Sequence, residues 1–461
     1  MESRDARVRE ALSAMEGAKN PLVVSHIDAD GITSAAIAIS VLRSRGADPK
    51  CVHLRQFAAE TLPEVERAAK GRDLAVFVDL GSGQLDHIAT LGIPAVILDH
   101  HHPMTGVELD GVHLNPQLFG VDGGSQCSGS TVAYLVAREA GLRETAPIAI
   151  VGAVGDMQDR RTGRLEAMNR IPVDDGKKDG TVEPTRGISF FGRETRPLAV
   201  LLSYASSPYL PGMTGDVDAC RTFLEAEGIP TRDEDDRALT YHDLALEDRV
   251  KLGDALVRFC IERRVPQWGI EALAKEYYVL PTRRKGTEMR DATEHSTLLN
   301  ACGRWGLASV GVKVCLQEEG YYAKASAMLR YHRQQLRSGL DELRERGATP
   351  IGRYVQLFES ETISPTVVGI IAGMGLGSRM VDHERVILAA ARDSGGRIKL
   401  SGRTTQRMVR AGVDLAAALS GAVERWGGES GGHDIAAGAY IDEEVLEAFI
   451  LEIDRIIAEQ V

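Results

Sequence analysis

The chain has 461 residues, of which 43% are hydrophobic and 26% are charged, and its formal net charge is −12. A chain of this length and composition is expected to form two or three globular domains, and its acidity excludes a general basic coat for nucleic acid but not a local basic groove. The six cysteines are widely spaced, without a C-x-x-C pair, which favours a reducing compartment.

The apolar pattern excludes two further classes of protein. No apolar run approaches the roughly 18 residues that a membrane-spanning helix needs. The first residues are charged and no apolar stretch follows them, so we expect no secretory signal. The sequence therefore predicts a cytoplasmic protein without a membrane partner.

The first hundred residues alternate short apolar runs with helical patterns. A helix over residues 3–18 with one apolar face comes first, and apolar or amphipathic helices are expected at 31–45 and 60–70. Strands alternating with helices predict a parallel sheet that is covered on both faces. The predicted strands are residues 21–25, 51–54, 74–80 and 95–98.

Acids and imidazoles follow these apolar runs. Because the carboxyl ends of parallel strands share one edge of a sheet, we expect the polar residues there to meet and to bind a ligand. A single aspartate at a strand end is often only a helix cap, but four such ends make capping alone an insufficient explanation. The four ends carry His26, Asp28 and Asp30, then Asp79, then Asp99, His100 and His101, and finally Asp156 after the apolar run 148–154.

A set of oxygen-rich ligands is available among these residues: Asp28, Asp30, Asp79, His100 and Asp156. Four carboxylates with one imidazole favour Mn²⁺ or Mg²⁺ over a closed zinc site. Two such ions, roughly 3.5–4 Å apart and bridged by one carboxylate, can activate water and stabilise the attacking and leaving oxygens at phosphorus. The sequence thus predicts phosphoester hydrolysis.

Four ordered segments resemble the motifs of the DHH phosphoesterases: HIDADG at 26–31, VDLG at 78–81, DHHHP at 99–103 and GDMQD at 155–159. The resemblance implies that the five ligands bind two divalent ions, Mn²⁺ preferred or Mg²⁺, with Asp79 as the bridge. It also implies two catalytic residues, His101 for the leaving group or phosphate and Asp99 to support the histidines. His26 replaces an aromatic residue common in bacterial members, and we assign it to the substrate side with its role left open.

The middle of the chain carries fewer signals. The segments 192–198 (GRETRPL) and 207–212 (SPYLPG) are similar to the archaeal RecJ-like nucleases, and we assign them no physical role. Residues 177–180 and 231–236 are expected to be solvated loops.

Basic residues outnumber acidic ones by 12 to 8 between residues 281 and 347. The segment LNACGR at 299–304 resembles the NAAGR stretch of RecJ nucleases, which implies that Asn300 binds substrate and that Arg304 is catalytic beside the scissile phosphate. An arginine can neutralise a phosphoryl oxygen. A surface ion pair is the alternative for Arg304.

A second α/β unit is expected from about residue 350, with a strand at 386–391. Its SGR and GGH segments resemble the DHHA1-type substrate-binding domain. Glycines let backbone N–H groups approach a phosphate, and arginine or histidine can donate to its oxygens. Five basic residues and no acid lie between 397 and 410. The implied substrate-binding residues are Ser401, Arg403, Gly431, Gly432 and His433.

These observations predict an α/β protein of three parts. Residues 1–320 form a parallel-sheet DHH catalytic domain that includes a helical middle segment from about 217, and residues 321–349 form a long connecting helix. Residues 350–461 form a smaller α/β domain of the DHHA1 type, which binds substrate.

The resemblance implies a two-metal phosphodiesterase of the archaeal RecJ-like, GINS-associated nuclease type. It would degrade single-stranded DNA in the 5′-to-3′ direction to mononucleotides, in DNA replication or repair. Two enzyme alternatives stay open, a 3′-to-5′ RNA exonuclease and an oligonucleotide phosphodiesterase. A replisome scaffold is the third, and the implied partners are single-stranded DNA or RNA, the GINS complex and the replicative helicase. The presence of every candidate ligand argues against a purely structural role.

Overall fold

The computed structural model describes residues 3–205, 207–393 and 395–461. Contacts between residues divide the chain into two compact units. The first unit ends at residue 204 and resumes over 216–329, and the second holds 205–215 and 330–461. Within the described residues, no helix is both long and apolar enough to cross a membrane.

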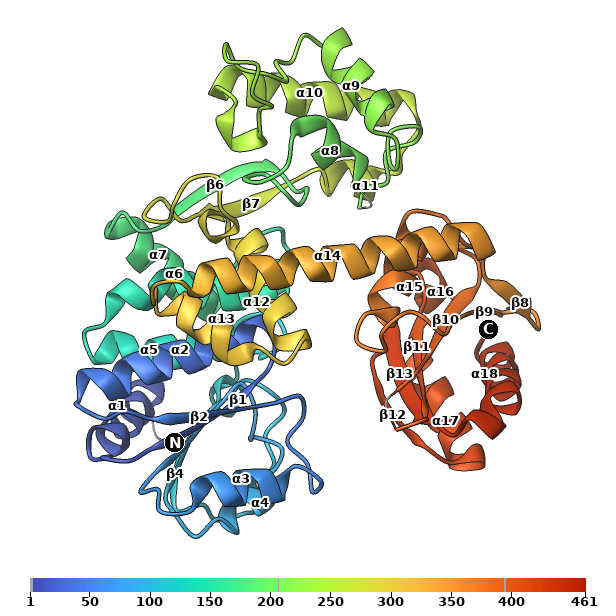
Figure 1. The fold of residues 1–461 in the computed structure, drawn as a ribbon. Coiled ribbons are helices and arrows are strands. Elements are labelled where there is room, and N and C mark those ends of the chain that lie inside the picture. Colours follow the sequence, from blue (N-terminus) through green and yellow to red (C-terminus); the bar gives the residue numbers. More distant parts are fainter. Residues whose placement is uncertain (1–2, 206, 394) are drawn as a thin grey trace. The chain divides into compact units, whose positions relative to one another are not determined.

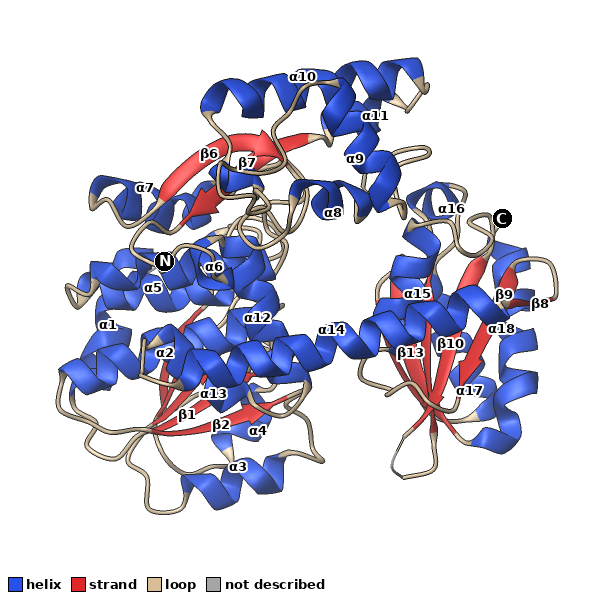
Figure 2. Ribbon diagram, turned by 45° about the horizontal axis from the view of Figure 1, so that its top comes forward, coloured by secondary structure: helices blue, strands red, loops and turns tan. Residues whose placement is uncertain are grey.

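The first unit is built on a parallel five-stranded sheet in the order β2-β1-β3-β4-β5. Two of its strands, β1 and β2, are labelled in Figure 2. Side chains alternate between its two faces, because successive residues of a strand point in opposite directions. Val76 and Val78 of β3 face one core, whereas Ala75 and Phe77 face the other. The strands are β1 (Leu22–His26), β2 (Lys50–Leu54), β3 (Ala75–Val78), β4 (Ala95–Leu98) and β5 (Gly111–Leu114).

Helices cover both faces of this sheet. The helices α1, α2, α5 and α6 form a core with one face, and α3 and α4 pack on the other, as Figure 1 shows. This arrangement leaves the carboxyl ends of the strands as an edge open to polar side chains. The helices are α1 (Arg4–Glu16), α2 (Ala29–Ser44), α3 (Leu62–Ala69), α4 (Leu85–Ala89), α5 (Gly129–Glu139) and α6 (Ala146–Gly155).

The apolar run 148–154 corrects one expectation. It lies within α6 and not in a strand, so Asp156 is delivered by the end of a helix. All residues of this helix from Ala146 to Val154 are buried. A helix that is buried on all sides has no periodic polar face, and a short apolar run then resembles a buried strand.

An insertion of helices separates the two strands of a small antiparallel sheet, β6 (Glu183–Ile188) and β7 (Ala274–Val279). The expected loop at 177–180 is only partly a loop, because α7 (Arg170–Lys178) extends into it with its two lysines in the last turn. The segment 231–236 lies outside the helices, as expected. The insertion holds α8 (Leu198–Ser203), α9 (Val217–Ala226), α10 (Leu246–Glu262) and α11 (Gln267–Glu271).

Three helices follow the insertion: α12 (Ala292–Arg304), α13 (Ala308–Cys315) and α14 (Tyr321–Arg346). The boundary between the two compact units falls inside α14, between residues 329 and 330. Short 3₁₀ helices occupy Pro116–Phe119, Arg143–Thr145, Ala167–Asn169, Tyr241–Asp243, Glu288–Arg290 and Glu443–Val445.

The second unit is a six-stranded mixed sheet in the order β12-β13-β11-β10-β9-β8. The helix α15 (Val368–Gly377) lies on one face, and α17 (Leu415–Trp426) and α18 (Leu446–Gln460) pack with the other, while α16 (Gln406–Arg410) follows β11. The expectation of a parallel-sheet domain and a second α/β domain is therefore confirmed. The strands are β8 (Thr349–Ile351), β9 (Val355–Ser360), β10 (Val386–Arg392), β11 (Ile398–Arg403), β12 (Glu429–Gly432) and β13 (Ala436–Ile441).

Candidate metal centre

The turn after β1 holds two aspartates in different ways. Asp28 caps α2, with its Oδ1 accepting a hydrogen bond of 2.9 Å from the Gly31 N–H. The Asp30 carboxylate accepts bonds of 2.7 and 2.9 Å from the N–H groups of Gly129 and Ser130, at the first turn of α5. A helix N-terminus stabilises negative charge, so α5 supports Asp30 in its buried position.

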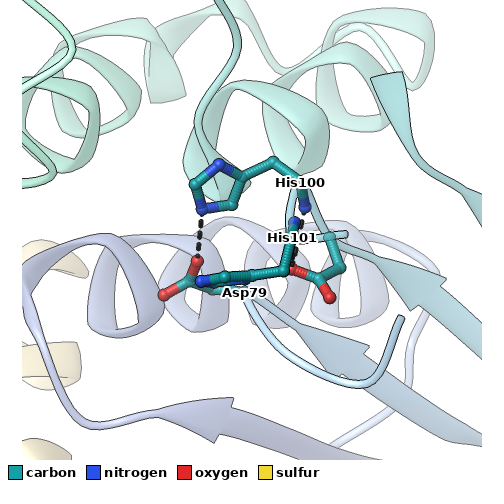
Figure 3. A group of neighbouring side chains, drawn as sticks. Asp79, His100 and His101 are labelled. Atoms are coloured by element: carbon teal, nitrogen blue, oxygen red, sulfur yellow. Dashed lines mark hydrogen bonds and ion pairs between the residues drawn. The ribbon is translucent and has the colours of Figure 1, made fainter. Parts of the chain in front are cut away.

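Asp79 lies between two groups of polar side chains. Its backbone is left-handed, with φ of 58°, as β3 ends. Its Oδ1 lies 3.1 Å from Nε2 of His100, and its Oδ2 lies 3.5 Å from Nδ1 of His26. Figure 3 shows the His100 ring directed at this carboxylate. Although Oδ1 is buried, it accepts no well-aligned hydrogen bond from the described residues.

Both of these histidines have one ring nitrogen occupied by a backbone carbonyl. Nδ1 of His100 lies 2.7 Å from the Gly123 carbonyl, and Nε2 of His26 lies 3.1 Å from the Arg55 carbonyl. The nitrogen that faces the carboxylates is then the one left to bind a cation. Metal-ligating histidines are commonly oriented in this way.

Asp99 organises the histidine segment through hydrogen bonds. Its Oδ1 accepts from the backbone N–H of His100 at 2.8 Å and lies 2.8 Å from Nδ1 of His101. Its Oδ2 accepts from the Ser82 N–H at 2.9 Å. Asp99 is fully buried, whereas the His101 side chain is 58% exposed. Asp99 thus holds the His101 ring from one side and leaves the other side to solvent.

Asp156 completes the acidic group at the end of α6. Its Oδ2 accepts a bond of 2.7 Å from Nε2 of Gln158 and lies 3.8 Å from Nε2 of His100. Burial raises the pKa of Asp156 to about 6, with His100 lowering it in part and Asp79 raising it.

The concentration of charge shifts the other groups as well. Burial and the nearby Asp79 raise the pKa of Asp30 well above its ordinary value. Burial alone would lower the pKa of His26, but Asp28 and Asp79 raise it to about 11. Burial likewise opposes the charged form of His100, and Asp79 outweighs it and raises the pKa. A divalent cation competes with protons for the same lone pairs and balances the same carboxylates.

Three groups of possible ligands have atoms within 4.8 Å of one another: Asp30, His100 and Asp156, then His26, Asp28 and Asp79, and finally Asp79, Asp99, His100 and His101. Because Asp99 already accepts from His101 and Ser82, the first two groups are the better candidates for ion sites. Oδ1 of Asp79 faces His100 of the first group at 3.1 Å, and its Oδ2 faces His26 of the second group at 3.5 Å. The arrangement fits two oxygen-preferring divalent ions that share one carboxylate.

Two residues of α12 lie near the turn that bears Asp28. Oδ1 of Asn300 accepts a hydrogen bond of 2.9 Å from the Ala29 N–H, so part of this side chain holds the protein backbone. Arg304 is exposed, and its side chain forms no hydrogen bond or ion pair with a described residue. The alternative of a surface ion pair for Arg304 therefore has no counterpart here.

The predicted substrate residues of the second unit come together in register. Gly438 of β13 pairs with Ser401 on one side and with Gly431 on the other, and Ala437 pairs with Gly432. The GGH segment is exposed throughout. Arg403 lies on the face covered by α15, where a side chain at position 369 would collide with its guanidinium.

Sequence reasoning missed the groups that orient the ligands. These include the backbone N–H groups at the start of α5, the Gly123 carbonyl and the Gln158 side chain. The sequence Ser128-Gly129-Ser130 at the start of a helical pattern carries a cap signal, but nothing local indicates that its N–H groups serve Asp30. His26 stands within a ligand group, which its assignment to the substrate side did not foresee.

Three parts of the chain match known domain families. Residues 20–154 match the N-terminal domain of the DHH family, residues 190–274 match the DHH-CID domain, and residues 352–459 match the DHHA1 domain. The DHH-CID match coincides with the insertion between β6 and β7.

Two relatives match the chain over different lengths. An uncharacterized protein of Methanocaldococcus jannaschii is 30% identical over 446 residues, covering 95% of this chain and 93% of that protein. The single-stranded-DNA-specific exonuclease RecJ of Escherichia coli is 32% identical over 109 residues, 21% of this chain and 18% of the relative.

Two structures share the fold over nearly the whole chain. RecJ from Thermus thermophilus in complex with Mn²⁺ has a TM-score of 0.59 at 20% identity, covering 98% of this chain and 55% of that one. CDC45 from Entamoeba histolytica has a TM-score of 0.64 at 13% identity, covering 99% of both chains. The chain thus spans about half the length of the Thermus RecJ.

Proposed function

This chain belongs to the DHH family, and we propose that it is a metal-dependent phosphodiesterase that degrades single-stranded nucleic acid from an end. The observation that carries the proposal is Asp79, whose two oxygens face two separate ligand groups. Two shared ions suit in-line displacement at phosphorus. The finer proposal is a 5′-to-3′ exonuclease on single-stranded DNA that releases mononucleotides in replication or repair.

Asp28, Asp30, Asp79, His100 and Asp156 would hold two divalent ions, Mn²⁺ or Mg²⁺. Such ions act as Lewis acids that draw charge from phosphoryl oxygens and lower the pKa of water. We add His26 to the ligands, because its Nδ1 lies 3.0 Å from Asp28 while its Nε2 is engaged by a carbonyl.

His101 and Asp99 act together at the leaving group in this proposal. The Asp99 carboxylate accepts a hydrogen bond from the His101 ring and raises the pKa of His101, which favours the cationic form of the ring. Its Nδ1 is held by Asp99, which leaves Nε2 to donate a proton to the departing oxygen or a hydrogen bond to the phosphate. Asp99 keeps the ring in this orientation.

Arg304 neutralises a phosphoryl oxygen, which its exposed guanidinium, unpaired among the described residues, supports. Asn300 holds the Ala29 N–H through its carbonyl and can donate to substrate through its amide nitrogen. Ser401, Arg403 and the exposed GGH segment bind the phosphate backbone of the strand.

Single strands of DNA or RNA, labelled at either end and incubated with the protein and Mn²⁺, test the proposal. Stepwise loss of the 5′ nucleotide from DNA is the expected result. Loss from the 3′ end of RNA would replace the finer proposal by an RNA exonuclease, and cleavage of two-to-five-residue oligomers alone would replace it by an oligonucleotide phosphodiesterase. If none of the labelled strands is shortened, the proposal that this protein is a nuclease is wrong.

The likeness to CDC45 over both whole chains supports a second candidate function, a replisome scaffold that binds the GINS complex and the replicative helicase. Asp79→Ala separates the two functions. A scaffold keeps its partners when this carboxylate is lost, whereas hydrolysis stops. Pull-down of purified GINS with the wild type and the variant measures the first function, and failure of both proteins to bind would exclude it.

A further inference from the structure

The segment 192–198 enters the interior of the first unit through a fully buried arginine. Arg193 has no exposed surface, and its five N–H groups all find acceptors. Two bonds of 2.9 and 3.0 Å form a fork on the carboxylate of Asp291, and a third of 3.1 Å reaches Oγ1 of Thr293. The remaining donors meet the carbonyls of Phe190 and Ile188. A bidentate arginine pair of this kind fixes geometry as well as charge.

The next two residues attach to the same helix. The Glu194 N–H donates to Oε1 of Glu294 at 2.7 Å, and the Thr195 hydroxyl donates to its other oxygen. The Glu194 carboxylate in turn meets Nδ1 of His242 at 2.7 Å. Glu194 and Glu294 are both at most 2% exposed. Three consecutive residues of the insertion therefore hold one turn of α12.

The turn that they hold is the beginning of α12. Asp291 is the N-cap of this helix, with its Oδ1 accepting from the N–H groups of Thr293 and Glu294. Arg193 thus fixes the residue that starts the helix. The guanidinium also lies 4.6 Å from the ring centre of Tyr277 in β7, which limits its movement on a second side.

The other end of α12 contacts the turn that carries the metal ligands. Asn300 accepts the hydrogen bond from Ala29, between Asp28 and Asp30. A side chain at Gly303 would collide with the Ile27 carbonyl, so the helix backbone lies directly against this turn. A helix is stiff and rises about 1.5 Å per residue, so a shift at its first turn is carried to Asn300, roughly 10 Å away.

We propose that Arg193, Glu194 and Thr195 are positioning residues that clamp the amino end of α12 and thereby set where Asn300 and Arg304 stand beside the metal centre. The part that concerns catalysis rests on the proposed function. The insertion between β6 and β7 then contributes to the geometry of the metal centre, because its first residues hold α12 and α12 contacts the turn that carries Asp28 and Asp30.

Arg193→Met removes the fork, and Thr195→Val removes one bond and is the milder change. The matched control is Arg170→Met, which breaks the contact of Arg170 with Glu276 of β7 and leaves α12 untouched. Hydrogen exchange of peptides that contain Ala29 reports on the Asn300 bond without any turnover. Kinetics on a labelled single strand and the affinity for Mn²⁺ are measured beside it.

We expect Arg193→Met to speed exchange at Ala29 by about tenfold or more, since local opening rather than global unfolding controls it. We expect kcat to fall by about 10²-fold, as displacement of positioned groups does, with KM changed less. The affinity for Mn²⁺ stays within about threefold, because the metal ligands have their own supports. Thr195→Val gives smaller changes in the same direction, and Arg193→Lys restores part of the loss.

Unchanged exchange at Ala29 in both Arg193→Met and Thr195→Val would overturn the clamp. So would an equal increase in Arg170→Met, because the effect would then be general destabilisation. If the wild type hydrolyses no strand, the proposed function fails, and the exchange measurements still decide whether the clamp exists.

Discussion

Asp30, Asp79 and His100 of the first unit are each at most 5% exposed, whereas the GGH segment of the second unit is exposed throughout. Ions need several ligands at fixed distances, and close carboxylates repel one another until a cation arrives. Their positions must therefore be enforced by helix ends and carbonyls. A flexible strand needs only donors spaced along a surface, which can remain open to solvent.

The strongest test of this contrast is removal of the shared carboxylate. We expect Asp79→Asn to lower kcat by about 10³-fold or more, because loss of charge stabilisation worth several kcal/mol has that effect on a rate. Single-turnover hydrolysis and Mn²⁺ titration measure it. Asp48→Asn, at an exposed carboxylate, is the control. A variant that kept a tenth of the activity would contradict the assignment of Asp79 as the bridge.

The support of the histidines is the next largest effect. Asp99→Asn keeps the shape but removes the charge that holds His101, and its side chain keeps only one of the two oxygens that accept from His101 and Ser82. Outer groups of this kind typically change activity by about 10- to 100-fold. The fall of kcat at high pH should begin at a lower pH in the variant, because Asp99 is what raises the pKa of His101. An unchanged profile would remove His101 from the chemistry.

Acid sensitivity of the first unit provides a third comparison. His295 on α12 is 1% exposed, both of its ring nitrogens lack partners among the described residues, and burial lowers its pKa to about 3. Between pH 6.5 and 3 the unfolded chain binds a proton that the folded chain does not, so stability falls as pH falls. At pH 5 the loss is about 2 kcal/mol.

Urea unfolding at pH 7 and pH 5, followed by hydrogen exchange of α12 peptides, measures this loss. His295→Leu should remove the contribution of this residue, because leucine binds no proton. Asp156, whose pKa is raised to about 6, shifts stability in the opposite direction in both proteins. Equal pH dependence in the variant and the wild type would show that other groups cause the acid sensitivity.

The smallest effect is expected in the second unit. His433→Ala should raise KM by about three- to tenfold, because one exposed hydrogen bond to a phosphate is lost, with kcat nearly unchanged. Steady-state kinetics on a long single strand measure it. A fall in kcat as large as that of Asp99→Asn would contradict the view that the GGH segment only binds substrate while the buried metal centre carries the chemistry.

Much of this protein follows from short stretches of sequence. The strands Ala75–Val78 and Ala95–Leu98 are short, apolar and followed by polar residues, and their side-chain alternation divides two cores as expected. The polar residues that follow these strands do meet, because parallel strands end at one edge. The local sequence pattern was sufficient to predict an element wherever burial of that segment's own apolar residues determined its structure.

The tertiary structure decided what depends on partners distant in sequence. The run 148–154 is a helix because it is surrounded by other apolar elements, which no local periodicity reveals. Asp30 is held by amides about 100 residues away, and Arg193 by a carboxylate 98 residues away. A buried charge needs a partner of opposite charge, but the sequence offers many acids that could serve as the partner of Arg193. Only the fold selects which one lies within reach.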